Sequence, residues 1–196
     1  MIRKRLVVLA SGSGTNLQAL LDAPDLGGDV VAVVSDKPAA GALERARAHD
    51  IAAAAVVLGG DRPAWEAELA DTVAAHDPDL VILAGFMRVL SGKFVHRWPV
   101  INVHPSLLPA FPGAHAIRDA LAWGVKLVGA TVHFVDEQVD HGPIIAQQAV
   151  AVREDDTVGS LHARVQVVEH RLLPDAVRAF CAGTLQIDGR HVRTPT

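Results

Sequence analysis

Short apolar runs, most of them rich in β-branched residues, recur through the first half of this chain and constrain its fold more than any other feature. They lie at residues 5–10 (RLVVLA), 29–35 (DVVAVVS), 52–57 (AAAAVV), 79–85 (DLVILAG) and 100–104 (VINVH). A strand with one exposed face alternates apolar and polar residues, whereas an unalternated run is buried on both faces. The runs therefore predict strands of a parallel sheet that helices cover on both sides.

Segments of helical length separate these runs. They are TNLQALLDA at 15–23, GALERARAHD at 41–50 and RPAWEAELADTVAAHD at 62–77. The third segment follows Asp61, a residue type favoured at the N-cap, and has Pro63 in its first turn, where the missing N–H costs nothing. This alternation of strands and helices is typical of a doubly wound α/β sheet with right-handed crossovers.

The second half of the chain has a different pattern. Residues 126–136 (KLVGATVHFVD) and 142–152 (GPIIAQQAVAV) predict two longer strands. The link between them is too short for a helical crossover, so the two strands are expected to be antiparallel. The predicted fold class is therefore α/β, doubly wound and mostly parallel, with antiparallel strands in the C-terminal half.

The C-terminal segment predicts one long helix followed by a hairpin. Residues 157–183 have helical periodicity, and a kink or interruption is expected near Pro174 because proline removes a backbone donor. The tail at 185–193 contains Asp188-Gly189, a two-residue hairpin signal. No linker marks a boundary, so we expect a single domain over 1–196, with a phosphate-binding half at about 1–100 and a catalytic half at about 101–183.

Composition excludes several classes of function. The 196 residues carry a formal net charge of −4 without a long basic run, which argues against nucleic acid as a partner. No apolar stretch is long enough to span a bilayer, and the apolar run near the N-terminus is too short for a signal peptide. The single cysteine, Cys181, cannot form an internal disulfide. We expect a cytoplasmic protein with small-molecule partners and no membrane association, as a monomer or a homodimer.

The loop after the first strand has the features of an anion site. Its sequence is SGSGTN, residues 11–16, and it leads directly into the first predicted helix, whose free N–H groups attract an anion. A dinucleotide fingerprint requires a third glycine where this chain has Leu17, and the P-loop lysine is missing. The loop fits one phosphate better than a pyrophosphate, although a plain turn and helix cap would use the same glycines. The candidate phosphate ligands are Gly12, Ser13, Gly14, Thr15 and Asn16.

The strand at 100–104 ends in two polar side chains, and a proline-rich segment follows it. Asn102 and His104 are two residues apart, so they point to the same face of the strand. In an open α/β sheet, ligands bind beyond the carboxyl ends of the parallel strands. An amide and an imidazole placed there suit stabilisation of an oxyanion or transfer of a proton.

The turn at 136–143 (DEQVDHGP) offers carboxylates that could accompany the imidazole. Asp136, Glu137 and Asp140 lie within it, and a carboxylate beside His104 would favour the protonated ring. His104 could instead be a core histidine bonded to backbone, and Asp140 an ordinary turn aspartate. The ten histidines show no metal-ligand spacing, so no metal site is expected.

Several blocks of sequence, in order along the chain, resemble the phosphoribosylglycinamide formyltransferases. The blocks are SGSGTNLQALLDA, VVSDKPAAGALERARAHDI, DLVILAGFMRVLSGKFV, INVHPSLLPAFPGAHAIRDAL, GATVHFVDEQVDHGPIIAQ and ARVQVVEH, and they cover about residues 5–183. The resemblance implies a Rossmann-like formyltransferase fold. It also implies transfer of a formyl group from 10-formyltetrahydrofolate, the co-substrate, to the amino group of glycinamide ribonucleotide, a step of purine biosynthesis that requires no metal or redox cofactor.

The resemblance also implies roles for individual residues. The family's catalytic Asn, His and Asp fall on Asn102, His104 and Asp140, and its phosphate loop falls on residues 14–16. Glu169 matches a glutamate that holds the glycinamide end of the substrate. Folate-binding positions fall on Arg62, Met87, Arg88, Val89, Leu90, Asn102, Asp136, Glu137, Gln138, Val139 and Asp140.

Two departures and three alternatives accompany this resemblance. Ala110 stands where the family commonly has Lys or Arg, and Ile117 where some members have a second histidine. Both departures affect only the expectations about loop closure and anion contacts. A formyltetrahydrofolate hydrolase, or another folate-dependent formyltransferase such as methionyl-tRNA formyltransferase, shares the Asn, His and Asp. The hydrolase usually has an extra N-terminal domain, and the tRNA enzyme has a further C-terminal domain and a basic surface. A non-enzymatic nucleotide-binding module is disfavoured by the presence of all three catalytic positions.

Overall fold

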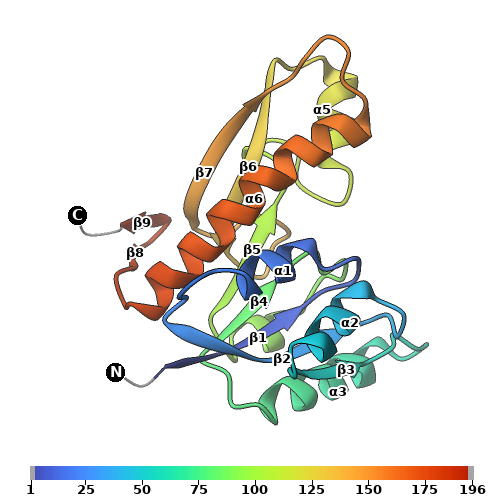
Figure 1. The fold of residues 1–196 in the computed structure, drawn as a ribbon, viewed down its shortest axis with the longest axis vertical. Coiled ribbons are helices and arrows are strands. Elements are labelled where there is room, and N and C mark those ends of the chain that lie inside the picture. The colour runs from blue at the N-terminus through green and yellow to red at the C-terminus, as the bar shows by residue number, and fades with distance from the viewer. Residues whose placement is uncertain (1–2, 194–196) are drawn as a thin grey trace.

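In the computed structural model, which describes residues 3–193, nine strands form one sheet in the order β3-β2-β1-β4-β5-β6-β7-β9-β8 (Figure 1). The strands from β3 to β5 are parallel, and β6 pairs antiparallel with both β5 and β7. The strands are β1 (Lys4–Leu9), β2 (Gly28–Ser35), β3 (Ala52–Ala55), β4 (Leu80–Leu83), β5 (Val100–His104), β6 (Leu127–Phe134), β7 (Ile144–Ala151), β8 (Gln186–Asp188) and β9 (His191–Arg193). The predicted α/β class, with a mostly parallel sheet and antiparallel C-terminal strands, is confirmed.

Six helices surround this sheet within the described residues. They are α1 (Thr15–Leu21), α2 (Gly41–Ala48), α3 (Arg62–Ala74), α4 (Gly92–Val95), α5 (Ala116–Trp123) and α6 (Val158–Cys181). Asp61 caps α3 as predicted, because its side chain accepts a hydrogen bond from the N–H of Ala64. Of the kink or interruption expected near Pro174, the interruption is wrong, since α6 continues through Pro174 without a break. The sequence analysis did not predict α4 or α5.

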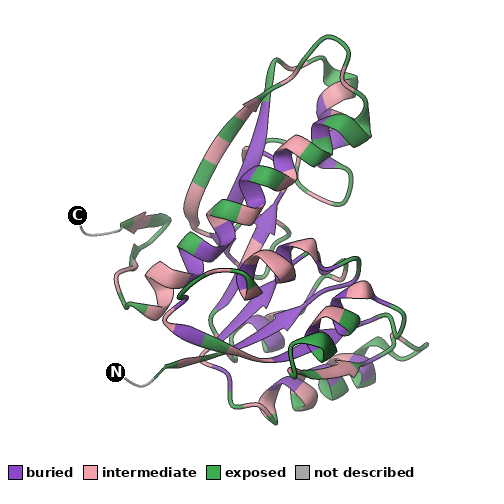
Figure 2. Ribbon diagram, viewed as in Figure 1, coloured by how far each residue is buried: buried purple, intermediate pink, exposed green. Residues whose placement is uncertain are grey.

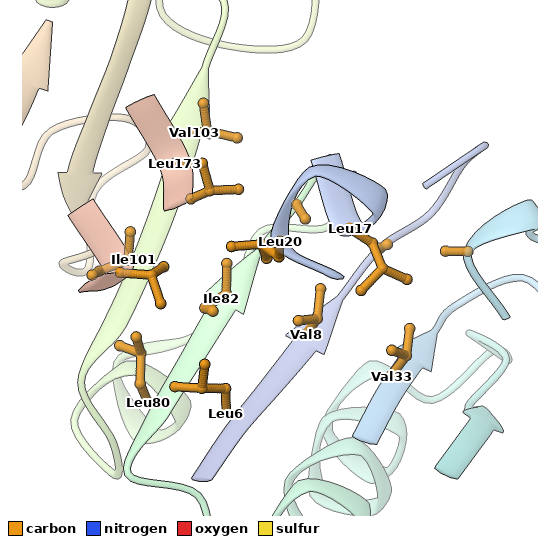
Figure 3. Close-up of a cluster of buried hydrophobic side chains, with 14 of the residues drawn as sticks. Leu6, Val8, Leu17, Leu20, Val33, Leu80, Ile82, Ile101, Val103 and Leu173 are labelled. Atoms are coloured by element: carbon orange, nitrogen blue, oxygen red, sulfur yellow. The ribbon is translucent and has the colours of Figure 1, made fainter. Parts of the chain in front are cut away.

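The two faces of the central strands are buried under different helices. In β1, Leu6 and Val8 face one layer, where α1, α2 and α6 pack, while Val7 and Leu9 face the other, where α3 and α4 pack. Figure 3 shows the first layer, in which Leu17 and Leu20 of α1 and Leu173 of α6 meet side chains of β1, β4 and β5. Burial on both faces explains why these strands carry unalternated apolar runs.

The C-terminal half extends beyond this core as a hairpin of β6 and β7 with α5 and the first turns of α6 beside it (Figure 1). Figure 2 shows that β6 is buried along most of its length, whereas β7, which lies farther out, alternates between half-buried and exposed residues. None of the helices within residues 3–193 combines the length and the apolar character needed to span a bilayer.

The hairpin predicted at the C-terminal end is present, but its turn lies one residue later than the Asp188-Gly189 signal indicates. Asp188 pairs with His191, so the two turn residues are Gly189 and Arg190. Gly189 has a φ of +57°, a conformation that glycine adopts without steric cost. The hairpin joins the main sheet through a parallel pairing of β9 with β7.

Candidate active site

A cleft of about 420 Å³ lies at the carboxyl ends of β1, β4 and β5, and the turn at 136–141 and α6 close it from the other side. Residues that the sequence analysis selected from four separate segments all line this cleft: 12–16, 87–90, Asn102 with His104, and 136–140. A second groove, of about 550 Å³, runs between α1, α2 and α6, but it contains none of the polar residues at the end of β5. The cleft is therefore the candidate active site.

The polar end of β5 meets the acidic turn at Asp140. The Nδ2 atom of Asn102 is 3.4 Å from Oδ1 of Asp140, and Nδ1 of His104 is 3.4 Å from Oδ2 of the same carboxylate. The Nε2 atom of His104 lies 2.9 Å from the carbonyl oxygen of Phe111. Both ring nitrogens therefore face acceptor oxygens, Nε2 at hydrogen-bond distance and Nδ1 at the distance of an ion pair.

Asp140 is held as a buried carboxylate in an uncommon backbone conformation. Its side chain is 10% exposed, and its φ of +52° lies in the left-handed region. Burial opposes ionisation, but the His133 ring, whose Nε2 atom lies 3.8 Å from Oδ1, the hydrogen bond from the N–H of Gly113 and the nearby His104 hold the pKa of Asp140 below its ordinary value. Asp140 is therefore ionised at neutral pH and supplies a fixed negative charge beside His104.

His133 is a member of this cluster that the sequence analysis did not select as a site residue. It is almost fully buried, its Nε2 atom lies 3.1 Å from Nδ2 of Asn102, and its Nδ1 atom lies 2.7 Å from the carbonyl oxygen of Phe134. The antiparallel register pairs Asn102 with His133 across β5 and β6. Only that register, which the sequence does not specify, places the imidazole where it can orient the amide.

The glycine-rich loop, residues 12–16, also lines the cleft. Gly14 caps α1 with a φ of +76°, and a Cβ atom there would lie 2.7 Å from Cα of Ala42. The carbonyl groups of Gly12 and Ser13 accept hydrogen bonds from α2, through the N–H of Ala42 and Nε of Arg45. With these carbonyl groups turned towards α2, the loop is suited to present N–H groups to an anion.

Glu169 of α6 lies directly behind this loop. Its Oε2 atom accepts a hydrogen bond of 2.9 Å from Nδ2 of Asn16, and both side chains are buried. Burial raises the pKa of Glu169, although the bond from Asn16 and the charges of His162 and His104 act in the opposite direction. The Oδ1 atom of Asn16 is buried without a hydrogen-bond partner among residues 3–193, so this end of the cleft retains an unused acceptor.

The loop after β4 forms the apolar rim of the cleft. Met87 and Val89 are exposed there, whereas Leu90 is buried. The N–H of Met87 donates to Oγ of Ser11, and Nε of Arg88 donates to Oδ2 of Asp36 at 2.6 Å. These bonds fix the loop against the ends of β1 and β2.

The family model described as formyl transferase matches residues 4–177. The chain belongs to this family. The phosphoribosylglycinamide formyltransferase of Mycobacterium tuberculosis (strain H37Rv) is 48% identical to it, over 95% of this chain and 89% of the relative. The enzyme of the same name from Escherichia coli (strain K12) is 42% identical, over 93% of this chain and 89% of the relative.

Solved structures agree with the formyl transferase assignment. The crystal structure of glycinamide ribonucleotide transformylase 1 from Symbiobacterium toebii has a TM-score of 0.94 and 49% identity, and covers 98% of this chain and 94% of that one. The phosphoribosylglycinamide formyltransferase from Coxiella burnetii, in complex with CHES, has a TM-score of 0.91 and 37% identity, with 97% and 93% covered. The resemblance seen in the sequence blocks is confirmed.

Of the remaining predicted folate-binding residues of this formyl transferase, some line the cleft and one does not. Glu137, Gln138 and Val139 line the cleft beside Asp136, whose Oδ2 atom lies 2.7 Å from Nδ1 of His141. Arg62 does not line the cleft. It lies behind the rim, where its guanidinium group donates to the carbonyl of Val89. Arg62 can therefore reach only a part of a ligand that extends out of the cleft.

Two cleft residues on α6, His162 and Gln166, were also missed by the sequence analysis. They precede Glu169 by seven and three residues, so all three lie on one face of the helix. Helical spacing back from Glu169 would have found them. Among residues 3–193, no three His, Cys, Asp or Glu side chains are grouped so that they could hold a metal ion.

We expect a cost in stability from the buried carboxylate of Glu169. Because its pKa is raised in the folded protein, the charged form destabilises the fold above that pKa. Glu169→Gln should therefore raise the melting temperature at pH 7 by a few degrees, given about 2–4 °C per kcal/mol for a domain of 150–250 residues. The gain should shrink as the pH falls towards 4, where the wild-type carboxyl is protonated. Thermal melts across this range test it, with exposed Glu68→Gln as the control; a gain independent of pH would contradict the explanation.

Proposed function

We propose that the protein transfers the formyl group of 10-formyltetrahydrofolate to the amino group of glycinamide ribonucleotide, giving formylglycinamide ribonucleotide and tetrahydrofolate. The observation that carries this proposal is that one cleft contains all the groups that this reaction needs. A loop suited to one phosphate, an apolar rim, and the side chains of Asn102, His104 and Asp140 all line it. A ribonucleotide bound at the loop and a folate bound at the rim would meet at these three side chains.

The ribonucleotide is assigned to the end with the glycine-rich loop. Its phosphate would bind the N–H groups of residues 12–16, and Glu169 would accept hydrogen bonds from donors on the rest of the molecule. The folate is assigned to the rim, where Met87, Val89 and Leu90 offer apolar contacts and the turn at 136–140 offers backbone groups. Arg62 and Arg88 would lie towards the anionic glutamate tail.

Chemistry begins when the substrate amine attacks the formyl carbon of the folate. A C–N bond forms, and the formyl oxygen becomes an oxyanion. Asn102 donates a hydrogen bond to this oxygen in place of its 3.4 Å contact with Asp140. His104 donates a second one in place of its bond to the carbonyl of Phe111.

Collapse of the tetrahedral intermediate breaks the bond to N10 of the folate. The amine loses one proton and N10 gains one, so the reaction needs no added oxidant or reductant. Asp140 receives the amine's proton, directly or through a water molecule, and His104 delivers a proton to the leaving nitrogen. Before these transfers, the positive charge on His104 is stabilised by the Asp140 carboxylate.

A folate assay separates this function from its alternatives. Tetrahydrofolate should form from 10-formyltetrahydrofolate only when glycinamide ribonucleotide is present, with one formylated ribonucleotide for each folate released. A hydrolase would release formate without the ribonucleotide, and a binding module would release nothing. Equal rates with and without the ribonucleotide would refute the proposal.

We place the enzyme in the cytoplasm, as a monomer or a homodimer.

Thr15→Asp tests which end of the cleft holds the phosphate. Thr15 is the first residue of α1, so a carboxylate there would repel an anion bound to the loop. The KM for glycinamide ribonucleotide should rise at least about 10-fold, the equivalent of about 1.4 kcal/mol, while the KM for the folate stays within twofold. Thr15→Val, which removes the hydroxyl without adding charge, is the control. A rise confined to the folate KM would mean that the two ends are assigned the wrong way round.

A further inference from the structure

The C-terminal hairpin lies next to the turn that carries Asp140. The hairpin is fixed to the body of the protein because Leu185 and Val192 pack against the main hydrophobic core. His191 of β9 pairs with Ile144, the first residue of β7 (Figure 1). Since the turn at 136–141 ends just before β7, this pairing brings the tip of the hairpin to the active site's acidic turn.

Arg190, the second residue of the hairpin tip, contacts both the backbone and the side chain of His141. One terminal nitrogen donates to the carbonyl oxygen of His141 at 2.6 Å, and the other lies 3.2 Å from Nε2 of the same residue. The nitrogen that approaches Nε2 also lies 3.4 Å from Nδ1 of His141, and Nδ1 in turn lies 2.7 Å from Oδ2 of Asp136.

These contacts close the turn around Asp140. Burial opposes ionisation of Asp136, but hydrogen bonds from His141 and from the N–H of Gln138, with the charges of His141 and Arg190, lower its pKa. The anchored His141 follows Asp140 directly, and the left-handed backbone of Asp140 persists only where its surroundings hold it. Arg190 fixes the carbonyl group of His141, the residue after Asp140, and His141 fixes Asp136 at the start of the turn. Both contacts restrict the backbone of Asp140.

We propose that Arg190 is a positioning residue that holds the 136–141 turn, and through it the Asp140 carboxylate, in the geometry that the reaction needs. Arg190 itself does not touch the cleft, so it acts through His141. Its effect on turnover rests on the proposed function, whereas its effect on the order of the turn does not.

Hydrogen exchange tests the ordering directly and requires no activity. Arg190→Ala should increase deuterium uptake in a peptide covering residues 136–142 by about 10-fold in rate, since an unsupported turn opens more often. Arg193→Ala is the matched control. Arg193 lies on the same hairpin and is exposed, and among residues 3–193 its guanidinium group forms an ion pair with Asp188 alone, at 3.8 Å. Equal uptake in the two variants would overturn the proposal.

Kinetics test whether this order matters for the reaction. In Arg190→Ala, kcat should fall about 10-fold while the KM for glycinamide ribonucleotide stays within twofold, because displacement of a catalytic group by about 1 Å costs up to about 10²-fold. Arg190→Lys should recover part of the loss through the single contact to the His141 carbonyl. A kcat equal to that of Arg193→Ala, despite faster exchange, would remove Arg190 from catalysis.

A double-mutant cycle links Arg190 to its contact. His141→Ala removes the ring that Arg190 contacts, at a position that is exposed. It therefore tests the same contact from the other partner, in case Arg190→Ala alters the hairpin itself. Because the two side chains act as one unit, the double variant should lose little more than either single variant. Multiplicative losses would mean that the two residues act independently and would overturn the proposed connection.

Discussion

Asp140→Asn should lower kcat by about 10²- to 10⁴-fold, the range typical of a missing acid–base group. Asparagine keeps the shape and can still accept the bond that the N–H of Gly113 donates at 2.7 Å. It cannot hold the negative charge that stabilises protonated His104, nor can it receive a proton from the amine. Both substrates should therefore bind with KM values close to wild type while turnover falls.

Two measurements complete this test. Asp155→Asn, at an exposed position, should leave kcat unchanged and controls for the loss of one surface charge. The loss of kcat in the double variant with His104→Ala and Asp140→Asn should be far smaller than the product of the two single losses. When two groups act as a unit, removal of either one already removes most of what the pair contributes. A double variant whose loss equals the product of the single losses would show that His104 and Asp140 contribute separately.

Asn102→Ala should lower kcat by about 10²- to 10³-fold, the cost measured when one oxyanion donor is removed from other enzymes. The bond from Asn102 is strongest to the oxyanion, so its loss affects the transition state more than the bound substrates. The KM values should therefore change by less than threefold, as steady-state and single-turnover rates can show.

Gln147→Ala is the matched control for Asn102→Ala. Its amide also lies near the end of β5, but it bonds to the carbonyl of Leu108 and to Oγ1 of Thr131 and does not line the cleft. Its loss should lower stability and leave kcat within threefold. If Asn102→Ala also keeps turnover within threefold of wild type, Asn102 has no part in the mechanism.

Local sequence patterns were sufficient to predict the central strands and three segments of the cleft lining. These segments are residues 12–16, Asn102 with His104, and the turn at 136–140. The period of two in a strand placed Asn102 and His104 on one face, and the glycine-rich loop followed the first strand into a helix. The two side chains do meet Asp140, and the loop does lie in the same cleft. Each of these inferences needed only the geometry of one element and the rule that parallel strands share a carboxyl edge.

The missed features depend on how distant segments are placed. His133 reaches Asn102 only through the register between β5 and β6. Arg190 reaches His141 only because the hairpin turn lies one residue later than its sequence signal. Pro174 was expected to kink or interrupt the last helix, and the helix is not interrupted, because packing of α6 against the sheet outweighs the local cost of proline. Such outcomes are set by tertiary contacts that no local pattern contains.

The sharpest test of the proposed site is a crystal structure with glycinamide ribonucleotide and a non-reactive analogue of 10-formyltetrahydrofolate. We expect the phosphate on the N–H groups of residues 12–16 and the pteridine at the rim formed by residues 87–90 and 136–140. The formyl oxygen should lie within hydrogen-bond distance of Asn102 and His104, with the amine on the side of Asp140. A phosphate bound at the rim, or a formyl group out of reach of both Asn102 and His104, would contradict it.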